Sequence, residues 1–183
     1  VKAKLHRRPW GELKTCTVRR INGKWFACLC QEIEAEHLPP STDAIGIDVG
    51  LKTFAALSNG VNIAPGNYGK KAMRALRKAQ RSLSRKKRGS SNRRKAIRRV
   101  AKIQMRVANA RKNFLHKLTT AIAKNHGTVV LEALKVRNMS ASAKGTVAEP
   151  GKMVRQKAGL NRAILDQGWG MFRTMLSWKL AER

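Results

Sequence analysis

Two carboxylates stand inside short apolar runs, where acidic residues are uncommon. Asp48 lies in AIGIDVGLK, residues 44–52, and Glu132 lies in TVVLEAL, residues 128–134. The 83 residues between them (132 − 48 − 1) contain no Asp or Glu. Aspartate is disfavoured in strands, and a carboxylate that is even partly buried needs a partner. The two side chains therefore call for a specific binding role.

A pair of carboxylates on strands predicts a Mg²⁺ site. Mg²⁺ prefers oxygen ligands, keeps several of its waters and bridges to substrate phosphates. Two such ions about 4 Å apart can activate an attacking water and stabilise a leaving oxygen. The alternative is structural, with Asp48 capping the turn at Gly50 and Glu132 paired with an arginine. For one residue alone the structural role is favoured, because isolated ion pairs are common. For the pair together the metal site is favoured.

The segment between the two carboxylates is strongly basic. The 183 residues include 40 Lys and Arg against 10 Asp and Glu, a formal charge of +30. Such a charge costs self-repulsion unless a polyanion relieves it, and neutralised phosphates release counterions. Nucleic acid, DNA or RNA, is therefore the expected partner, with a merely solvated basic surface as the alternative. The candidate phosphate-binding residues are Lys70, Lys71, Arg74, Arg77, Lys78, Arg81, Arg85, Lys86, Lys87, Arg88, Arg93, Arg94, Lys95, Arg98 and Arg99.

Short strands and two helices must position these residues. Three strands are predicted in AIGIDV, TFAALS and VNIAP, with a turn at Asn59-Gly60. TVVLEAL predicts a fourth, buried strand. Helices are predicted from about residue 68 and from about 93 to 125, because apolar residues such as Ile97 recur every three or four positions. The polar loop 89–92 between them indicates an antiparallel pair. Gly127 is expected to end the second helix in the left-handed conformation.

The two ends of the chain carry further elements. Residues 14–34 predict a β-hairpin that turns at Asn22-Gly23, and residues 37–43 a linker. A lone hairpin is marginally stable, so this one must pack on something or belong to a larger sheet. Residues 137–159 are expected to be mobile. Two short helices are predicted around Gly168 and Gly170, and their aromatic residues are expected in the core: Trp169, Phe172 and Trp178.

The cysteines and apolar runs exclude several classes of protein. The three cysteines form no CxxC pair, so neither a disulfide framework nor a zinc site is expected. Reduced thiols fit a cytoplasmic protein. The first residues lack the apolar segment of a signal peptide. No run approaches the roughly 18 apolar residues of a membrane span, so no membrane partner is expected.

Four segments, taken in order, resemble the TnpB family of transposon-encoded proteins, also called OrfB, which are related to type V CRISPR effector nucleases. The segments are GIDVGLKTFAALSNG, RSLSRKKRGSSNRRKAIRRVAKIQMRVANARKNFLHKLT, VVLEALKVRNM and AILDQGWGMFRTMLSWK. GIDVG alone has low specificity, because actin- and Hsp70-like ATPases share such a turn. The four segments together are much more specific, and the resemblance covers about residues 41–181.

This resemblance implies an α/β fold and a nuclease function. It implies an incomplete RuvC-like domain of the RNase H fold over residues 41–183, with a helical insertion at about 68–125. Residues 1–40 would be the C-terminal remnant of a β-barrel domain. The function implied is RNA-guided, Mg²⁺-dependent DNA cleavage, with Asp48 and Glu132 as catalytic metal ligands. The basic helices would lie along guide RNA and target DNA, where the protein reads backbone and shape.

The sequence departs from the family pattern at its end. In the family, a third catalytic aspartate follows a zinc ribbon of paired CxxC motifs, and this sequence reaches Arg183 before either. Asp166 is expected to cap a helix N-terminus instead. A two-carboxylate site is expected to bind Mg²⁺ more weakly, so this chain is expected to cleave DNA poorly or not at all. The alternative function is a non-catalytic nucleic-acid-binding module: a transposon remnant, a regulator or an RNA chaperone.

Overall fold

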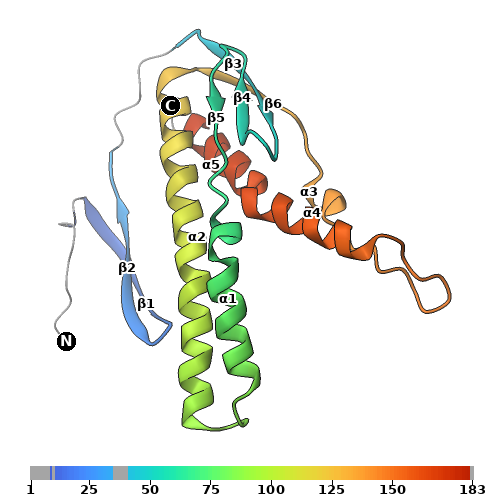
Figure 1. The fold of residues 1–183 in the computed structure, drawn as a ribbon. Coiled ribbons are helices and arrows are strands. Elements are labelled where there is room, and N and C mark those ends of the chain that lie inside the picture. The colour runs from blue at the N-terminus through green and yellow to red at the C-terminus, as the bar shows by residue number, and fades with distance from the viewer. Residues whose placement is uncertain (1–8, 10, 35–40, 182–183) are drawn as a thin grey trace.

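A computed structural model describes residue 9 and residues 11–34 and 41–181 (Figure 1). It is a mixed α/β structure, as the sequence predicts. Its elements in chain order are β1 (Glu12–Ile21), β2 (Lys24–Glu32), β3 (Ala44–Val49), β4 (Ala55–Leu57), β5 (Asn62–Ile63), α1 (Tyr68–Ser84), α2 (Ser91–Asn125), β6 (Thr128–Leu131), α3 (Val136–Met139), α4 (Val154–Gln167) and α5 (Trp169–Ala181).

A four-stranded sheet organises residues 41–181. Its strand order is β5-β4-β3-β6, with β3 antiparallel to β4 and parallel to β6. Parallel strands need a long crossover, and here the crossover contains β4, β5, α1 and α2. Successive side chains of a strand point to opposite faces. Ile45 and Ile47 accordingly face the core and are buried, whereas Asp48 faces away and is exposed.

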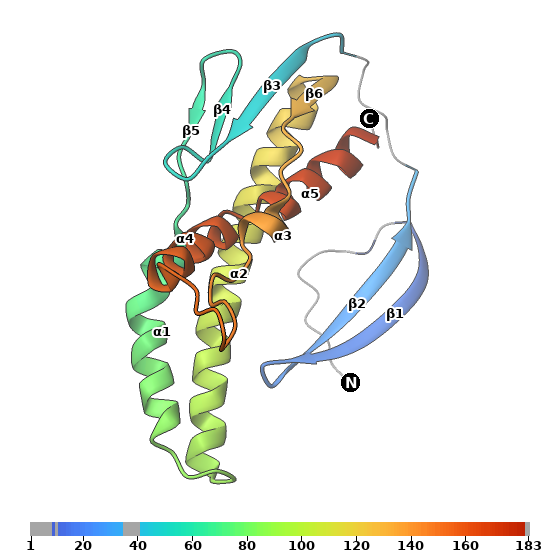
Figure 2. The same ribbon diagram turned by 90° about the vertical axis from the view of Figure 1, so that its right-hand side faces the viewer.

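Helices α1 and α2 form the predicted antiparallel hairpin. The sheet lies near the end of α2, and the α1–α2 loop lies at the opposite, projecting end (Figures 1 and 2). Ser90 caps α2 by accepting a hydrogen bond from the Arg93 N–H, at 3.1 Å. Ile97 was expected on the packed face but is 47% exposed, because it lies near the projecting end of the hairpin.

The core lies where the sheet, the second half of α2 and α5 meet. Phe54 packs edge-on against Phe114 and Phe172, with ring centroids 5.2 and 5.4 Å apart. Trp169 and Phe172 are buried, as predicted. Trp178 is 45% exposed, so its predicted place in the core is wrong. It lies on the other side of α5 and has the Lys179 ammonium 6.0 Å from its ring centroid.

Lys179 fastens α5 to α2. Its ammonium donates to the His116 carbonyl at 2.8 Å and to the Thr119 and Thr120 hydroxyls at 2.8 and 2.6 Å. These bonds use all three donors of one ammonium. They fix the direction of α5, and therefore the position of its first residue, Trp169.

The end of α2 differs from the prediction. Gly127 does not adopt a positive φ; the helix ends at His126, whose backbone is extended. The Gly127 N–H donates to the Asp43 carbonyl at 3.0 Å, and a Cβ at this position would collide with the Ser41 carbonyl. Glycine is needed here for the close approach of two chain segments. A glycine that follows a helix can serve either a close approach of two segments or a left-handed backbone, and the sequence does not distinguish the two.

Two other predictions need correction. The strand TVVLEAL is shorter than predicted, since β6 ends at Leu131. It is half-buried on one face and exposed on the other, where Val130 is 63% exposed. The segment 137–159 is partly helical, because it includes most of α3 and the first turns of α4. Gly168, at φ 75°, separates α4 from α5, whereas Gly170 lies inside α5.

The hairpin β1–β2 turns at Asn22-Gly23 as predicted, with φ of 51° and 83°. Both strands are exposed over nearly their whole length, including Trp25 and Phe26 at 68% and 42%. A side-chain contact of Asn22 with the Ala101 carbonyl, at 3.4 Å, joins the turn to α2. The three cysteines are free thiols on these strands. Within the described part of the chain, no helix is long and apolar enough to cross a membrane.

Candidate metal centre and nucleic-acid interface

The sheet places Asp48 beside Glu132. Strands β3 and β6 are parallel, and Ile47 is paired with Leu131. Asp48 is the next residue of β3, and Glu132 is the first residue after β6. Neighbouring strands lie about 4.8 Å apart, so the two carboxylates leave the chain from adjacent positions. Asp48 and Glu132 are therefore neighbours in space although 83 residues separate them in the sequence.

Both carboxylates are exposed. Over the described ranges 11–34 and 41–181, neither makes a side-chain hydrogen bond or an ion pair. The N–H of Gly50 donates to the Phe54 carbonyl at 3.2 Å, so Asp48 does not cap that turn. Glu132 has no arginine partner within the same ranges. Neither contact of the structural alternative is therefore present among the described residues.

The prediction that the carboxylates lie in buried strands also needs correction. Each strand packs on the core through one face, with Ile47 buried and Leu131 half-buried, and is open on the other. The sequence does not reveal the open face, because two of its residues, Gly46 and Val130, are not polar. The strands therefore look apolar on both faces. Asp48 and Glu132 thus remain accessible to a ligand from solvent.

Two hollows border the carboxylates. One, of about 540 Å³, has Asp48 and Lys52 at its edge and an apolar floor that includes Ile164. The other is a small cavity of about 30 Å³ beside Glu132 and Arg173. Trp169, the first residue of α5, borders both. Sequence reasoning missed Lys52 and Arg173 as site residues. Lys52, four residues after Asp48, could have been found from spacing, but Arg173 is brought close only by the fold.

The donor set at this edge of the sheet fits a hard cation. Two carboxylates in adjacent positions repel each other unless a cation lies between them, and carboxylate oxygens suit Mg²⁺ or Mn²⁺. None of the residues that line the two hollows is a Cys or His, the side chains that most zinc sites use. Among the described residues no cluster of three or more His, Cys, Asp and Glu could hold a metal ion. The candidate site thus offers two carboxylates from this part of the chain.

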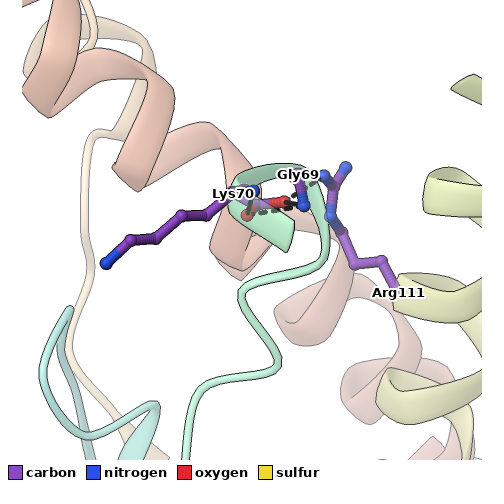
Figure 3. A network of polar contacts seen from close by, with 4 residues as sticks. Gly69, Lys70 and Arg111 are labelled. Carbon is purple, nitrogen blue, oxygen red and sulfur yellow. Dashed lines mark hydrogen bonds and ion pairs between the residues drawn. The ribbon is translucent and has the colours of Figure 1, made fainter. Parts of the chain in front are cut away.

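Asp166 has a structural role away from the candidate metal centre. Its carboxylate accepts hydrogen bonds from the N–H groups of Gly69, at 2.9 Å, and Lys70, at 3.3 Å, in the first turn of α1. It also pairs with the Arg111 guanidinium of α2 at 2.6 Å (Figure 3). The expected cap is confirmed, but it serves α1 rather than a helix that begins after Asp166. Asp166 supplies the cap of α1 from elsewhere in the chain, because the side chain of the N-cap residue Asn67 makes no cap hydrogen bond.

The predicted phosphate-binding residues form a cationic face on the helical hairpin. Some of them line a trough of about 860 Å³ whose side chains come from α1 and from the two residues that follow it, Arg85 and Lys86. The basic members of the trough are Lys70, Arg74, Arg77, Lys78, Arg81, Arg85 and Lys86. Lys70, Arg74, Arg77 and Arg81 recur at three or four residues, so these four share one face of α1, which rises about 5.4 Å per turn. The trough is a channel between long side chains rather than an enclosed cavity.

The other predicted basic residues divide into two groups. Exposed cations occur in the loop and on the first turns of α2: Lys87, Arg88, Arg94, Lys95, Arg98 and Arg99. Arg93 is half-buried, and its guanidinium donates to the carbonyls of Leu83 and Lys86 at 3.3 and 3.2 Å. It holds the α1–α2 loop together, and its role as a phosphate-binding residue stays a prediction. Lys71 is exposed but does not line the trough.

Comparisons with known proteins agree with the resemblance. A family described as "Probable transposase" (OrfB_IS605) matches residues 27–143, more than half of the chain. "Putative RNA-guided DNA endonuclease InsQ" of Escherichia coli (strain K12) is 44% identical over 170 residues, which are 92% of this chain and 42% of the relative. "Putative RNA-guided DNA endonuclease" of Streptomyces pristinaespiralis is 39% identical over 171 residues, 93% of this chain and 39% of that protein.

A more distant relative, "Putative RNA-guided DNA endonuclease Rv2885c" of Mycobacterium tuberculosis (strain ATCC 25618 / H37Rv), is 30% identical over 171 residues and covers 89% of this chain. The chain spans less than half the length of these relatives. The family match includes Asp48, Glu132 and both helices of the basic hairpin. This chain belongs to the OrfB_IS605 transposase family, the TnpB-type family that its sequence resembles.

Proposed function

We propose that this chain carries the metal-binding part of an RNA-guided, Mg²⁺-dependent DNA endonuclease. The observation that supports it most is the alignment of Asp48 with Glu132 on adjacent parallel strands. The names of the relatives agree with this activity. In this proposal residues 41–183 belong to a RuvC-like domain of the RNase H fold. Residues 1–40 belong to the end of a β-barrel domain, and about 68–125 form a helical insertion.

Each part of the site has a proposed role. Asp48 and Glu132 would hold the divalent ion, which supplies activation of a water and stabilisation of the leaving oxygen. Lys52 and Arg173 border the same hollows and would attract the backbone phosphates of the strand to be cut. The cationic face of α1 and α2 would hold nucleic acid by its backbone, while base pairing with a guide RNA reads the sequence.

A cleavage experiment tests this proposal. The protein is purified without nuclease treatment, the RNA bound to it is sequenced, and DNA complementary to that RNA is added with Mg²⁺. Because this part of the chain offers two carboxylates rather than three, the proposal predicts weak Mg²⁺-dependent cutting, and this cutting should be lost in Asp48→Ala and in Glu132→Ala. Glu149→Gln removes an exposed carboxylate far from both residues in sequence and should leave cutting unchanged. Cutting that persists in Asp48→Ala would contradict the assignment.

A non-catalytic nucleic-acid-binding function is the second candidate. It is favoured by the absence of a three-ligand metal cluster from the described ranges. The same experiment separates the two functions. Binding of RNA and complementary DNA without any cutting, at saturating Mg²⁺, would favour the non-catalytic function for this chain. Failure to retain any nucleic acid at low salt would contradict both.

A further inference from the structure

Trp169 has a buried indole N–H without a partner. The residue is 6% exposed, and its Nε1 atom is buried with no hydrogen-bond acceptor among the residues that the structure describes. A buried Trp N–H usually finds a partner, and one left unpaired costs stability. Phenylalanine would fill a purely apolar site without this cost, so the N–H calls for an acceptor.

Of the two hollows that Trp169 borders, the larger has Asp48 and Thr53 as acceptor side chains, and the small cavity has Glu132. Trp169 borders the small cavity of about 30 Å³ together with Glu132. The other side chains around this cavity are apolar, apart from the cationic Arg173 and the glycine Gly170. Glu132 is therefore the one side chain at the cavity that can accept a hydrogen bond. Its carboxylate is exposed and has no other partner within the described ranges, so it is free to turn toward the indole.

The size of the cavity allows either a direct bond or one bridging water. A space of about 30 Å³ exceeds the roughly 10–15 Å³ that a single ordered water needs, and a bridging water is nearly as good as a direct bond. In metal sites the ligating carboxylates are themselves held by hydrogen bonds from neighbouring groups, which fix their orientation. The indole N–H of Trp169 can orient a ligating carboxylate in this way, because Lys179 and Phe172 anchor α5 on the core.

We propose that Trp169 is a positioning residue for the metal centre, whose indole N–H donates to the Glu132 carboxylate, directly or through one water, and holds it toward the ion. This inference rests on the proposed function. It assigns Trp169 a role through Glu132 rather than through contact with the metal or the nucleic acid. Trp178, on the same helix but 45% exposed, should have no such role.

Nuclear magnetic resonance of the indole N–H groups tests the inference. The chain has 4 tryptophans, and Trp169→Phe identifies the resonance of Trp169. Addition of Mg²⁺ should shift this resonance, whereas the Trp178 resonance should stay unchanged. In Glu132→Ala the shift should disappear. A Trp169 resonance that does not move at Mg²⁺ concentrations that saturate the site would overturn the inference.

A second variant removes the donor and keeps the shape. Replacing Trp169 by 3-benzothienylalanine exchanges the N–H for sulfur in a ring of the same form. Metal binding, measured with Mn²⁺, should weaken about ten-fold, as for other groups that orient metal ligands, while the thermal midpoint stays nearly constant. Trp178→Phe should bind Mn²⁺ like the wild type. Unchanged Mn²⁺ affinity in the benzothienylalanine variant would contradict the role.

The inference and the proposed function can fail separately. Without metal, Glu132→Ala should still move the Trp169 resonance, because the proposed hydrogen bond does not need the ion. If that change is seen but no metal binds, the positioning contact stands and the nuclease proposal fails. If metal binds and Trp169 does not respond to Glu132→Ala, the nuclease proposal stands and the inference is wrong.

Discussion

The cationic trough on α1 makes a quantitative prediction about nucleic-acid binding. Lys70, Lys78 and Lys86 all line it and are exposed. Lys70 and Lys78 lie about 12 Å apart along α1, and Lys86 follows the end of this helix. Changing all three to Gln removes three positive charges from the trough. None of the three makes a side-chain hydrogen bond or ion pair within the described part of the chain, so the helix should be preserved.

The magnitude follows from counterion release. Each phosphate contact contributes about 0.7 to the slope of log affinity against log salt for single strands and about 0.9 for duplex DNA. Losing three contacts should reduce the slope by about 2 for a single strand and by nearly 3 for a duplex. At 0.1 M salt the same loss weakens single-strand binding about 100-fold, and near 1 M salt the difference should vanish.

Fluorescence anisotropy of a labelled oligonucleotide, repeated at several salt concentrations, measures this slope. The matched control changes Lys24, Lys144 and Lys152 to Gln, which are exposed lysines outside the trough. It removes the same charge, so a response to net charge alone would affect both variants equally. Equal slopes for the two triple variants would refute the trough as the binding track.

Further predictions concern stability. Asp166→Ala should lower the free energy of unfolding by about 3 kcal/mol, because it leaves the half-buried Arg111 guanidinium without its partner. Urea unfolding measures this loss. A loss below about 1 kcal/mol would contradict the structural role of Asp166. Gly127→Ala should lower the free energy of unfolding by about 2 kcal/mol, because the new Cβ meets the Ser41 carbonyl. Gly170→Ala, a change inside α5 where the new Cβ meets open space, should raise it by about 0.5–1 kcal/mol. Equal effects of the two variants in thermal unfolding would contradict this. Burial, and then the charges of Lys179 and Lys112, lower the pKa of His116 below 6.5. The contribution of neutral His116 to the free energy of unfolding is therefore fully present above about pH 6.5. It should be lost as the pH falls through the lower pKa of the folded state. His116→Gln should flatten this part of the urea-midpoint profile, and an unchanged profile would contradict the assignment.

Much of the site could be predicted from the residues. The apolar run around Asp48 gave β3 its observed bounds, and the three- to four-residue spacing predicted both long helices. The pairing of Asp48 with Glu132 was inferred from the carboxylate-free segment between them. That inference holds because a parallel crossover returns the chain to the neighbouring strand.

The remaining features depend on tertiary packing that a sequence does not express. Arg93 looks like its basic neighbours in sequence, yet it is used to hold the α1–α2 loop. Gly127 is required by a contact with Ser41, far along the chain. Trp169 was predicted as a core residue and is one, but its place between the two hollows follows from how α5 packs on α2. Asp166 was expected to cap a helix, and only the fold shows that the helix is α1.

The central claim is that Asp48 and Glu132 form one divalent-metal site. Mn²⁺ binding, followed by electron paramagnetic resonance, tests it most directly in the wild type, Asp48→Asn, Glu132→Gln and the control Glu149→Gln. The account predicts saturable Mn²⁺ binding that weakens at least ten-fold in each of the first two variants, since each removes one of two charged ligands. The control should bind like the wild type. Equal Mn²⁺ affinity in all four proteins would contradict the claim.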